Sequence, residues 1–276
     1  MSDSSETISE GDIVATPDDD TPARGRGKRK PAKPSRPPWQ SALRWVGEFA
    51  AYVLIAVLVV TLVRLFLVQP FLVPSESMEQ TLTQNDTILV WKPGAPVRGE
   101  IVVFRDDLGW LPPQAGATPW WKNALAAVKI LPPQNEQYLV KRLIGLPGDH
   151  VVCCDDKNRI VVNGQPLEES SYLYYSNPAI AMMAFDIVVP KGRFFVMGDH
   201  RDRSADSRMH WCNGPEQTPQ LAFPSLDAIQ GRTFAIMRPF SRATTFSIPD
   251  TFSTIPPPTA EAPDPTTKQM SCPTLG

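Results

Sequence analysis

A single apolar stretch near the N-terminus restricts what this chain can fold into. Residues 49–68 read FAAYVLIAVLVVTLVRLFLV, and Arg64 is the only charged residue among them. A helix of this length spans about 30 Å, the thickness of a bilayer core. Buried helices of soluble proteins are rarely apolar on every face. The stretch therefore predicts one transmembrane helix, over residues 44–68, with Arg64 near its end, where a long side chain can reach the headgroups.

The charges that precede this stretch predict its orientation. Residues 1–20 hold seven acidic residues and no basic one, whereas residues 21–40 hold seven basic residues and no acidic one. Basic flanks stay cytoplasmic, so the chain beyond the helix is expected outside the cytoplasm. A cleaved signal peptide does not fit, because more than 40 residues precede the stretch and no small-x-small site follows it.

The ends of the chain are polar and rich in proline. Residues 1–43 and 249–276 hold 13 of the 30 prolines, although they are only about a quarter of the chain. Such segments cannot bury enough surface to offset the entropy of ordering. We therefore expect a disordered cytoplasmic tail over residues 1–43 and a proline-rich disordered tail over 249–276. The net charge of -2 argues against a nucleic-acid partner.

Short runs of β-branched and aromatic residues dominate the chain between these limits. Turn-forming residues separate the runs, and Asn163-Gly164 is a strong hairpin signal. Many short strands with few helical patterns predict a mainly β fold, an antiparallel β-sheet domain over residues 69–248. The runs expected as strands are 69–73, 87–91, 100–104, 137–143, 159–162, 187–189, 193–197 and 233–237.

A tryptophan-rich insertion over residues 109–133 interrupts the strand pattern. It contains Trp110, Trp120 and Trp121. Aromatic rings favour the headgroup zone of a bilayer, so these residues fit a membrane interface. They fit equally well a surface loop or short helix packed on the sheet, and the sequence leaves both interpretations open.

The four cysteines are expected on the oxidising side of the membrane, where a disulfide persists. They are Cys153, Cys154, Cys212 and Cys272. The chain has no CxxC motif and its three histidines are scattered, so no metal site is expected. Adjacent cysteines cannot easily both pair with distant partners. A bond from one of them to Cys212 is our expectation, although the sequence does not decide the connectivity.

Residues suited to nucleophilic catalysis lie in three segments. Residues 74–82 read PSESMEQTL, residues 138–149 read YLVKRLIGLPGD, and residues 198–208 read GDHRDRSADSR. A serine hydroxyl is a poor nucleophile until a base takes its proton. No histidine lies in the context of a common triad, whereas Lys141 is flanked by aliphatic residues whose burial would keep its amine neutral. Ser77 and Lys141 are thus candidates for a serine–lysine pair, a variant of the triad.

These three segments, in this order behind a membrane anchor, resemble the type I signal peptidases of bacteria. The resemblance extends from about Phe49 to about Phe240. It implies a membrane-anchored serine endopeptidase that removes N-terminal signal peptides from secreted preproteins. It also implies that no cofactor is needed. The expected partners are preprotein signal peptides, the lipid bilayer and, as a candidate, the secretion machinery.

The resemblance assigns a role to each matching residue. Ser77 would be the nucleophile and Lys141 the general base. The hydroxyl of Ser75 would form an oxyanion hole with the backbone N–H of Ser77, and Ser204 would hold the lysine amine in place.

Residues around the catalytic pair receive supporting roles. Asp206 and Arg208 match structural residues near the site, expected as an ion pair that supports their loop. Met78, Leu82 and Leu139 are the candidate walls of an apolar pocket that selects small side chains by excluding bulk.

The chain departs from the common family pattern at a few positions. Glu76 stands where many relatives have glycine, and Glu100 also departs from the usual residue. His200 and Arg203 occupy positions often held by asparagine. Because Glu76 precedes the candidate nucleophile, its side chain is expected to affect substrate fit or oxyanion geometry.

Two other interpretations remain open at this point. A self-cleaving, repressor-like serine–lysine protease would share a related β fold, but the anchor and the lack of a DNA-binding helix pair count against it. A membrane-tethered binding or scaffold protein with lapsed catalytic residues is the second, and Glu76 is the feature that favours it.

Overall fold

The computed structural model describes residues 38–113, 136–176, 183–211, 219–259 and 261–265 of the 276-residue chain. Most of the predicted N-terminal tail therefore lies outside the described residues. The same holds for Trp120, Trp121, Cys212 and Cys272.

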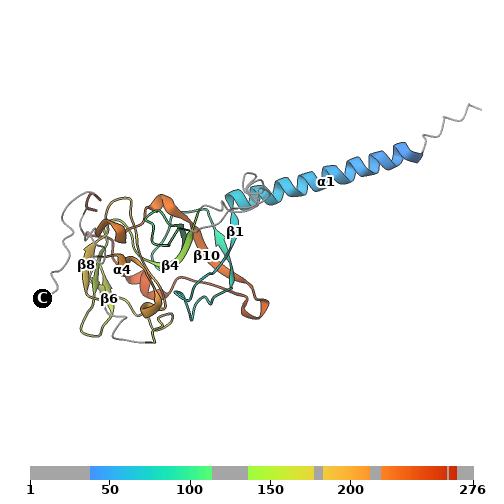
Figure 1. The fold of residues 1–276 in the computed structure, drawn as a ribbon. Helices are drawn as coiled ribbons and strands as arrows, with labels where there is room; N and C mark the ends of the chain where they lie inside the picture. Colours follow the sequence, from blue (N-terminus) through green and yellow to red (C-terminus); the bar gives the residue numbers. More distant parts are fainter. Residues whose placement is uncertain (1–37, 114–135, 177–182, 212–218, 260, 266–276) are drawn as a thin grey trace, which may run out of the picture. The chain divides into compact units, whose positions relative to one another are not determined.

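The N-terminal helix α1 runs from Pro38 to Phe66 (Figure 1). It begins six residues before the predicted span. Its segment Ala42–Phe66 is long and apolar enough to cross a membrane. Large apolar side chains are exposed along its length, including Phe49, Leu54 and Leu58. Because water solvates such a surface poorly, the helix fits a lipid environment.

Among the described residues, the larger sheet has seven strands (Figure 1). The order is β1-β2-β10-β3-β4-β9, with β11 paired to β10, and every named pair is antiparallel. This confirms the predicted antiparallel β fold behind one apolar helix. The strands are β1 (Val68–Leu72), β2 (Thr87–Trp91), β3 (Ile101–Arg105), β4 (Tyr138–Gly145), β9 (Phe195–Met197), β10 (Ile229–Arg238) and β11 (Thr244–Thr245).

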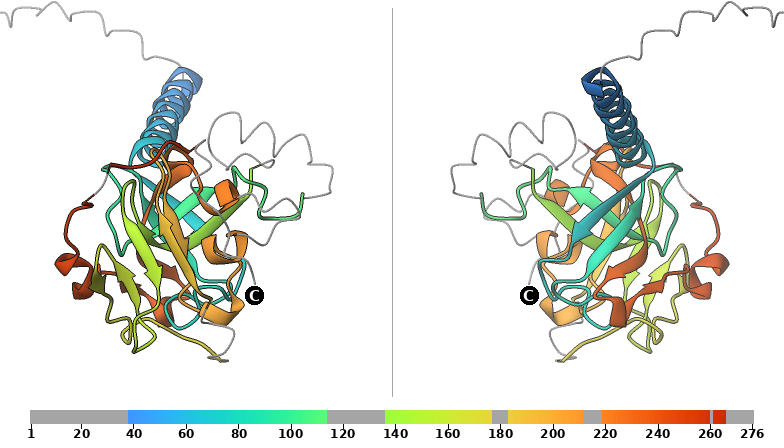
Figure 2. Two further views of the ribbon diagram at one scale, coloured as in Figure 1. Left: turned by 90° about the vertical axis from the view of Figure 1, so that its left-hand side faces the viewer. Right: turned by 90° about the vertical axis from the view of Figure 1, so that its right-hand side faces the viewer.

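In the described part of the chain, the smaller sheet (Figure 2) has four strands, which pair in the order β7-β6-β5-β8. The predicted hairpin is confirmed, since β6 and β7 pair across Asn163 and Gly164. Both turn residues have positive φ, 52° and 79°, as a two-residue hairpin turn requires. The strands are β5 (His150–Cys153), β6 (Ile160–Val162), β7 (Gln165–Pro166) and β8 (Phe185–Val188). The sequence reading missed β5, whose run of apolar residues is short.

Short helical turns connect the strands of the two sheets. One of them, α4, begins at Ser207, near the end of the third motif segment. The turns are η1 (Arg201–Arg203), α4 (Ser207–His210), η2 (Pro219–Ala222), η3 (Leu226–Ala228), η4 (Phe240–Arg242) and η5 (Asp250–Thr254).

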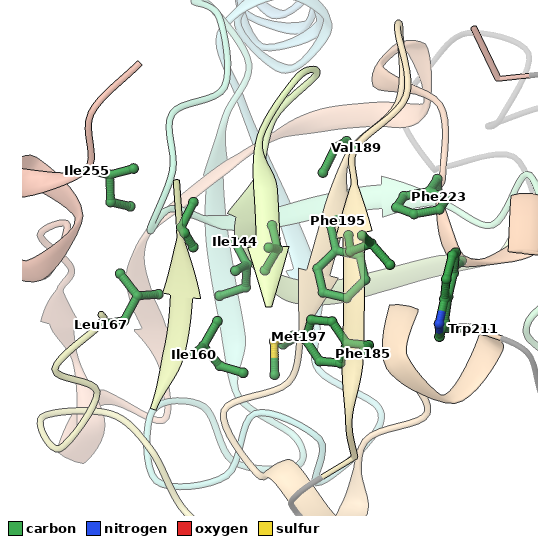
Figure 3. Close-up of a cluster of buried hydrophobic side chains, with 14 of the residues drawn as sticks. Ile144, Ile160, Leu167, Phe185, Val189, Phe195, Met197, Trp211, Phe223 and Ile255 are labelled. Atoms are coloured by element: carbon green, nitrogen blue, oxygen red, sulfur yellow. The ribbon is translucent and has the colours of Figure 1, made fainter. Parts of the chain in front are cut away.

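A buried apolar cluster joins the two sheets (Figure 3). Ile144, Phe195 and Met197 from the larger sheet pack against Ile160 and Phe185 from the smaller one. Each fully buried side chain of this size stabilises the fold by about 1.5–3 kcal/mol. The cluster therefore fixes β4, which carries most of the second motif segment, and β9, which directly precedes the third.

The beginning of the predicted C-terminal tail is part of this folded domain. Residues 250–254 form η5, and the side chains of Phe252 and Ile255 are buried in the cluster that joins the sheets. The ring of Phe252 also stacks on Tyr172. The composition of residues 249–276 predicted disorder because most of these residues are proline or polar. The burial of Phe252 and Ile255 nevertheless packs the beginning of the segment against the domain.

The described part of the tryptophan-rich insertion packs on the domain. The indole of Trp110 stacks on the ring of His210 with 4.4 Å between centroids. Its Nε1 donates a hydrogen bond to the carbonyl of Leu221, and Phe104 meets it edge-on. For Trp110 the structure favours packing on the sheet over a membrane interface.

The expected disulfide to Cys212 is wrong for both adjacent cysteines. Cys153 and Cys154 are bonded to each other. Strand β5 ends at Cys153, and Cys154 lies outside it, two residues before a turn at 156–157. Since the chain leaves the regular strand at this point, the two sulfurs can meet locally without a distant partner.

Candidate active site

The segment after β1 forms a compact turn that presents Ser77. The carbonyl of Met78 accepts hydrogen bonds from the N–H groups of Thr81 and Leu82, and the N–H of Glu79 donates to the carbonyl of Glu76. The side chains of Met78 and Leu82 are buried in an apolar cluster with residues of β1, β2 and β3. Burial of these two side chains holds the backbone of the turn in place, and hence the hydroxyl of Ser77.

Strand β4 carries the second candidate. It lies between β3 and β9, and successive residues of a strand point to opposite faces. Lys141 and Arg142 therefore face opposite sides of the sheet. The Nζ atom of Lys141 lies 2.5 Å from the Oγ atom of Ser77. Both side chains are nearly inaccessible to water, 3% exposed for Lys141 and 6% for Ser77.

Burial changes the acidity of the lysine amine. It lowers the pKa of Lys141 from 10.5 to about 8, against the opposing effect of the carboxylates of Asp206 and Asp199. With a pKa of this value, about one amine in ten is neutral at pH 7. A neutral amine 2.5 Å from a hydroxyl can accept its proton, so this pair has the arrangement of a nucleophile and its general base.

Asp206 and Arg208 form a buried ion pair beside this contact. The Nε and Nη2 atoms of Arg208 donate to the two carboxylate oxygens at 2.9 and 2.8 Å. The backbone N–H of Gly198 donates to the same carboxylate at 2.9 Å. Although burial opposes ionisation, the guanidinium and these hydrogen bonds hold the pKa of Asp206 below its ordinary value. The pair connects the end of β9 to α4 and so shapes the loop that carries Ser204.

A second buried ion pair lies on the opposite face of β4, and the sequence reading did not assign it. Arg142 binds Asp199 through two hydrogen bonds, of 2.8 and 2.7 Å. Thr81, in the turn after Ser77, donates to the same carboxylate at 2.6 Å. The guanidinium also stacks on the ring of Tyr172. Through these contacts Asp199, in the loop after β9, connects β4 to the turn that presents Ser77 (residues 76–82, the nucleophile turn).

Gly198 allows a close approach between the nucleophile turn and the loop of Ser204. A methyl group on Gly198 would lie 2.3 Å from the Oγ of Ser204 and 2.4 Å from the backbone oxygen of Ser77. Only a hydrogen fits in that space. The structure thus brings the side chain of Ser204 and the backbone of Ser77 against Gly198, with the side chain of Ser204 buried.

The other predicted site residues lie at different depths. Ser75 is exposed, and its Oγ is 3.3 Å from the Oγ of Ser77. Met78 and Leu82 are buried in one apolar cluster, whereas Leu139 is buried in another, with Val102, Leu143 and Phe194. The structure does not bring the three predicted pocket residues together as one open wall, because each fills the core beneath its own segment.

Comparison with known proteins identifies the family to which this site belongs. The family model described as signal peptidase, peptidase S26, matches residues 46–237. The chain belongs to this signal peptidase family. A signal peptidase I from Mycobacterium tuberculosis is 37% identical over 222 residues, which cover 71% of this chain and 72% of that protein.

More distant relatives carry the same name. A signal peptidase I from Bacillus licheniformis is 32% identical over 172 residues, covering 58% of this chain and 77% of that protein. A crystal structure of a signal peptidase I from Enterococcus faecalis is 25% identical and covers 50% of this chain and 97% of its own, with a TM-score of 0.31. The signal peptidase family consists of serine hydrolases that remove signal peptides from preproteins.

The space beside Gly198 leads to a prediction for this peptidase. We expect Gly198→Ala to lower kcat/KM by about 100-fold, because a displacement of about 1 Å at a catalytic pair has an effect of that size. Cleavage of a preprotein by the purified variant would measure the loss, and thermal unfolding would show whether the domain still folds. Gly47→Ala is the matched control, since nothing lies within 4 Å of the added carbon. Full activity of Gly198→Ala would contradict the close approach.

Proposed function

We propose that this signal peptidase is anchored in the membrane and cleaves with Ser77 as nucleophile and neutral Lys141 as general base. The observation that carries the proposal is the 2.5 Å contact between the two side chains, where burial lowers the pKa of the lysine to about 8. Relatives with the name signal peptidase I support signal peptides as the substrate class.

In the proposed reaction the amine of Lys141 first accepts a proton and then donates it. The Oγ of Ser77 attacks the carbonyl carbon of the last signal-peptide residue, and its proton passes to the Nζ of Lys141. The resulting ammonium then gives this proton to the amine of the leaving mature protein as the peptide bond breaks. A water molecule then gives one proton to the neutral amine and attacks the acyl ester. The ammonium returns this proton to the Oγ of Ser77 as the ester bond breaks and the signal peptide leaves with a free carboxyl group.

Charge develops on the carbonyl oxygen during both attacks. We assign its stabilisation to the hydroxyl of Ser75 and the backbone N–H of Ser77. The position of Ser75, on the exposed side and 3.3 Å from the nucleophile, supports this role. Donors fixed before the reaction stabilise such an oxyanion without reorganisation. Ser204 is proposed to orient the amine of Lys141.

The edge of β4 offers a binding site for the substrate backbone. Residues 138–141 pair with β3 along one edge. Along the other edge, within the part of the chain that the structure describes, β9 pairs only with Arg142, Leu143 and Gly145. An extended peptide adding a strand to the remaining edge would run directly past Lys141.

The catalytic pair is tested by two alanine variants. We expect Ser77→Ala and Lys141→Ala each to lower preprotein processing by the detergent-solubilised protein by at least about 1,000-fold, as losses of a nucleophile or its base do. Ser170→Ala and Lys157→Ala change exposed residues of the same types and should keep full activity. Unchanged processing in either Ser77→Ala or Lys141→Ala would reject this catalytic pair. If the unaltered protein does not process the preprotein, the alternative of a membrane-tethered binding or scaffold protein is favoured.

The lowered pKa of Lys141 predicts the pH dependence of cleavage. Since the neutral amine is the active form, kcat/KM should rise about tenfold per pH unit below pH 8 and level off above it. A pH profile of the purified enzyme from pH 5 to 10 measures this. A limb centred near pH 6.5 would instead indicate a histidine as the base.

The basic residues before α1 support a cytoplasmic N-terminus and an extracytoplasmic peptidase domain. Protease added outside cells without a wall barrier should degrade the β domain and spare a tag fused to Met1, as seen by immunoblotting. Solubilising the membrane should expose the tag as a control. Protection of the β domain in the intact cells would reverse the proposed orientation.

A further inference from the structure

Two residues that depart from the common family pattern contact each other at the active site. The Nη1 of Arg203 lies 2.7 Å from the Oε2 of Glu76, and both side chains are about half exposed, 58% and 47%. Glu76 directly precedes the nucleophile Ser77. The ion pair is therefore a solvent-facing element at the rim of the catalytic pair.

The loop of Arg203 is fixed to the nucleophile turn by His200. The backbone N–H of His200 donates to the carbonyl of Ser77 at 3.1 Å, and its ring Nδ1 lies 3.2 Å from the carbonyl of Glu76. The imidazole is buried. Because the two backbones are held together here, the distance between the Glu76–Arg203 pair and the nucleophile is set by the fold rather than by flexible side chains.

The surrounding charges are mostly negative. Glu79 is part-exposed and lies 3.2 Å from the Nδ1 of His200, and Asp202 lies 3.3 Å from the Nε2. Both carboxylates, together with Glu76, raise the pKa of Arg203. Arg203 is thus the cation that balances Glu76 at this rim.

We propose that Glu76 and Arg203 determine the charge preference of the enzyme for the substrate residues next to the scissile bond. The inference rests on the proposed cleavage by Ser77. A scissile carbonyl in contact with Ser77 brings the adjoining substrate residues within about 8 Å of the neighbouring side chain of Glu76, two to three residues of extended chain. At that distance and with an effective dielectric constant of about 40, between the values for bulk water and for a protein surface, one unit charge changes binding about fivefold.

The opposite charges of Glu76 and Arg203 largely cancel in their effect on a bound substrate. The intact pair therefore tolerates either sign of charge beside the cleavage site, which suits a peptidase that processes different preproteins. Removal of one partner exposes the charge of the other, and the two single variants should develop opposite preferences.

The test uses three preproteins that carry Lys, Gln or Glu as the first residue of the mature protein. We expect Arg203→Gln to raise kcat/KM for Lys and lower it for Glu, each about fivefold relative to the Gln substrate. Glu76→Gln should do the reverse, and the double variant should return to the preference of the unaltered enzyme. In about 1 M salt, where the screening length is about 3 Å, the shifts should largely disappear.

The controls separate charge recognition from folding and from the proposed chemistry. Arg159→Gln and Glu168→Gln break an ion pair that flanks strands β6 and β7, away from Ser77, and should leave the preference unchanged. A purely structural role would change all three substrates by the same factor. Equal factors, or shifts of the same sign in both single variants, would overturn the inference. Failure of the cleavage proposal would be seen separately, as processing that survives Ser77→Ala.

Discussion

The burial of one lysine amine is the constraint on which the rest of the site depends. Burial lowers the pKa of Lys141 from 10.5 to about 8, which corresponds to a cost of about 3 kcal/mol for the charged amine. Since the folded pKa is lowered, the fold is destabilised by this amount below pH 8, and the cost vanishes as pH rises beyond 10.5. The apolar clusters around β4 offset it, and the gain is an amine that can act as a base.

Two buried ion pairs hold the segments that position the amine of Lys141 and the hydroxyl of Ser77. Asp206–Arg208 shapes the loop on one side, and Arg142–Asp199 ties β4 to the turn of Ser77 on the other. A buried charge that loses its partner typically costs about 3–5 kcal/mol, so each pair holds its segments firmly. Successive side chains of β4 point to opposite faces of the sheet, so the adjacent basic residues Lys141 and Arg142 contact different partners. Lys141 faces Ser77, whereas Arg142 faces the carboxylate of Asp199.

Local patterns sufficed to predict a large part of this protein. The apolar helix and the Asn163-Gly164 hairpin follow from hydrophobic run length and from turn chemistry, which act over a few residues. The candidate residues Ser77 and Lys141 could be named because each lies in a recognisable segment, with apolar neighbours that foretell burial of the lysine. Strand β5 was missed because four residues carry little periodic signal.

The sequence by itself determined the membrane-length helix, the antiparallel β class and the identity of the residues that can do chemistry. Only the tertiary structure decided which of them meet. The docking of Phe252, the bond between Cys153 and Cys154, and the pairing of Glu76 with Arg203 became visible only there. Composition and spacing describe each segment alone, whereas these contacts depend on how the sheets bring segments together, and no local pattern encodes that distance.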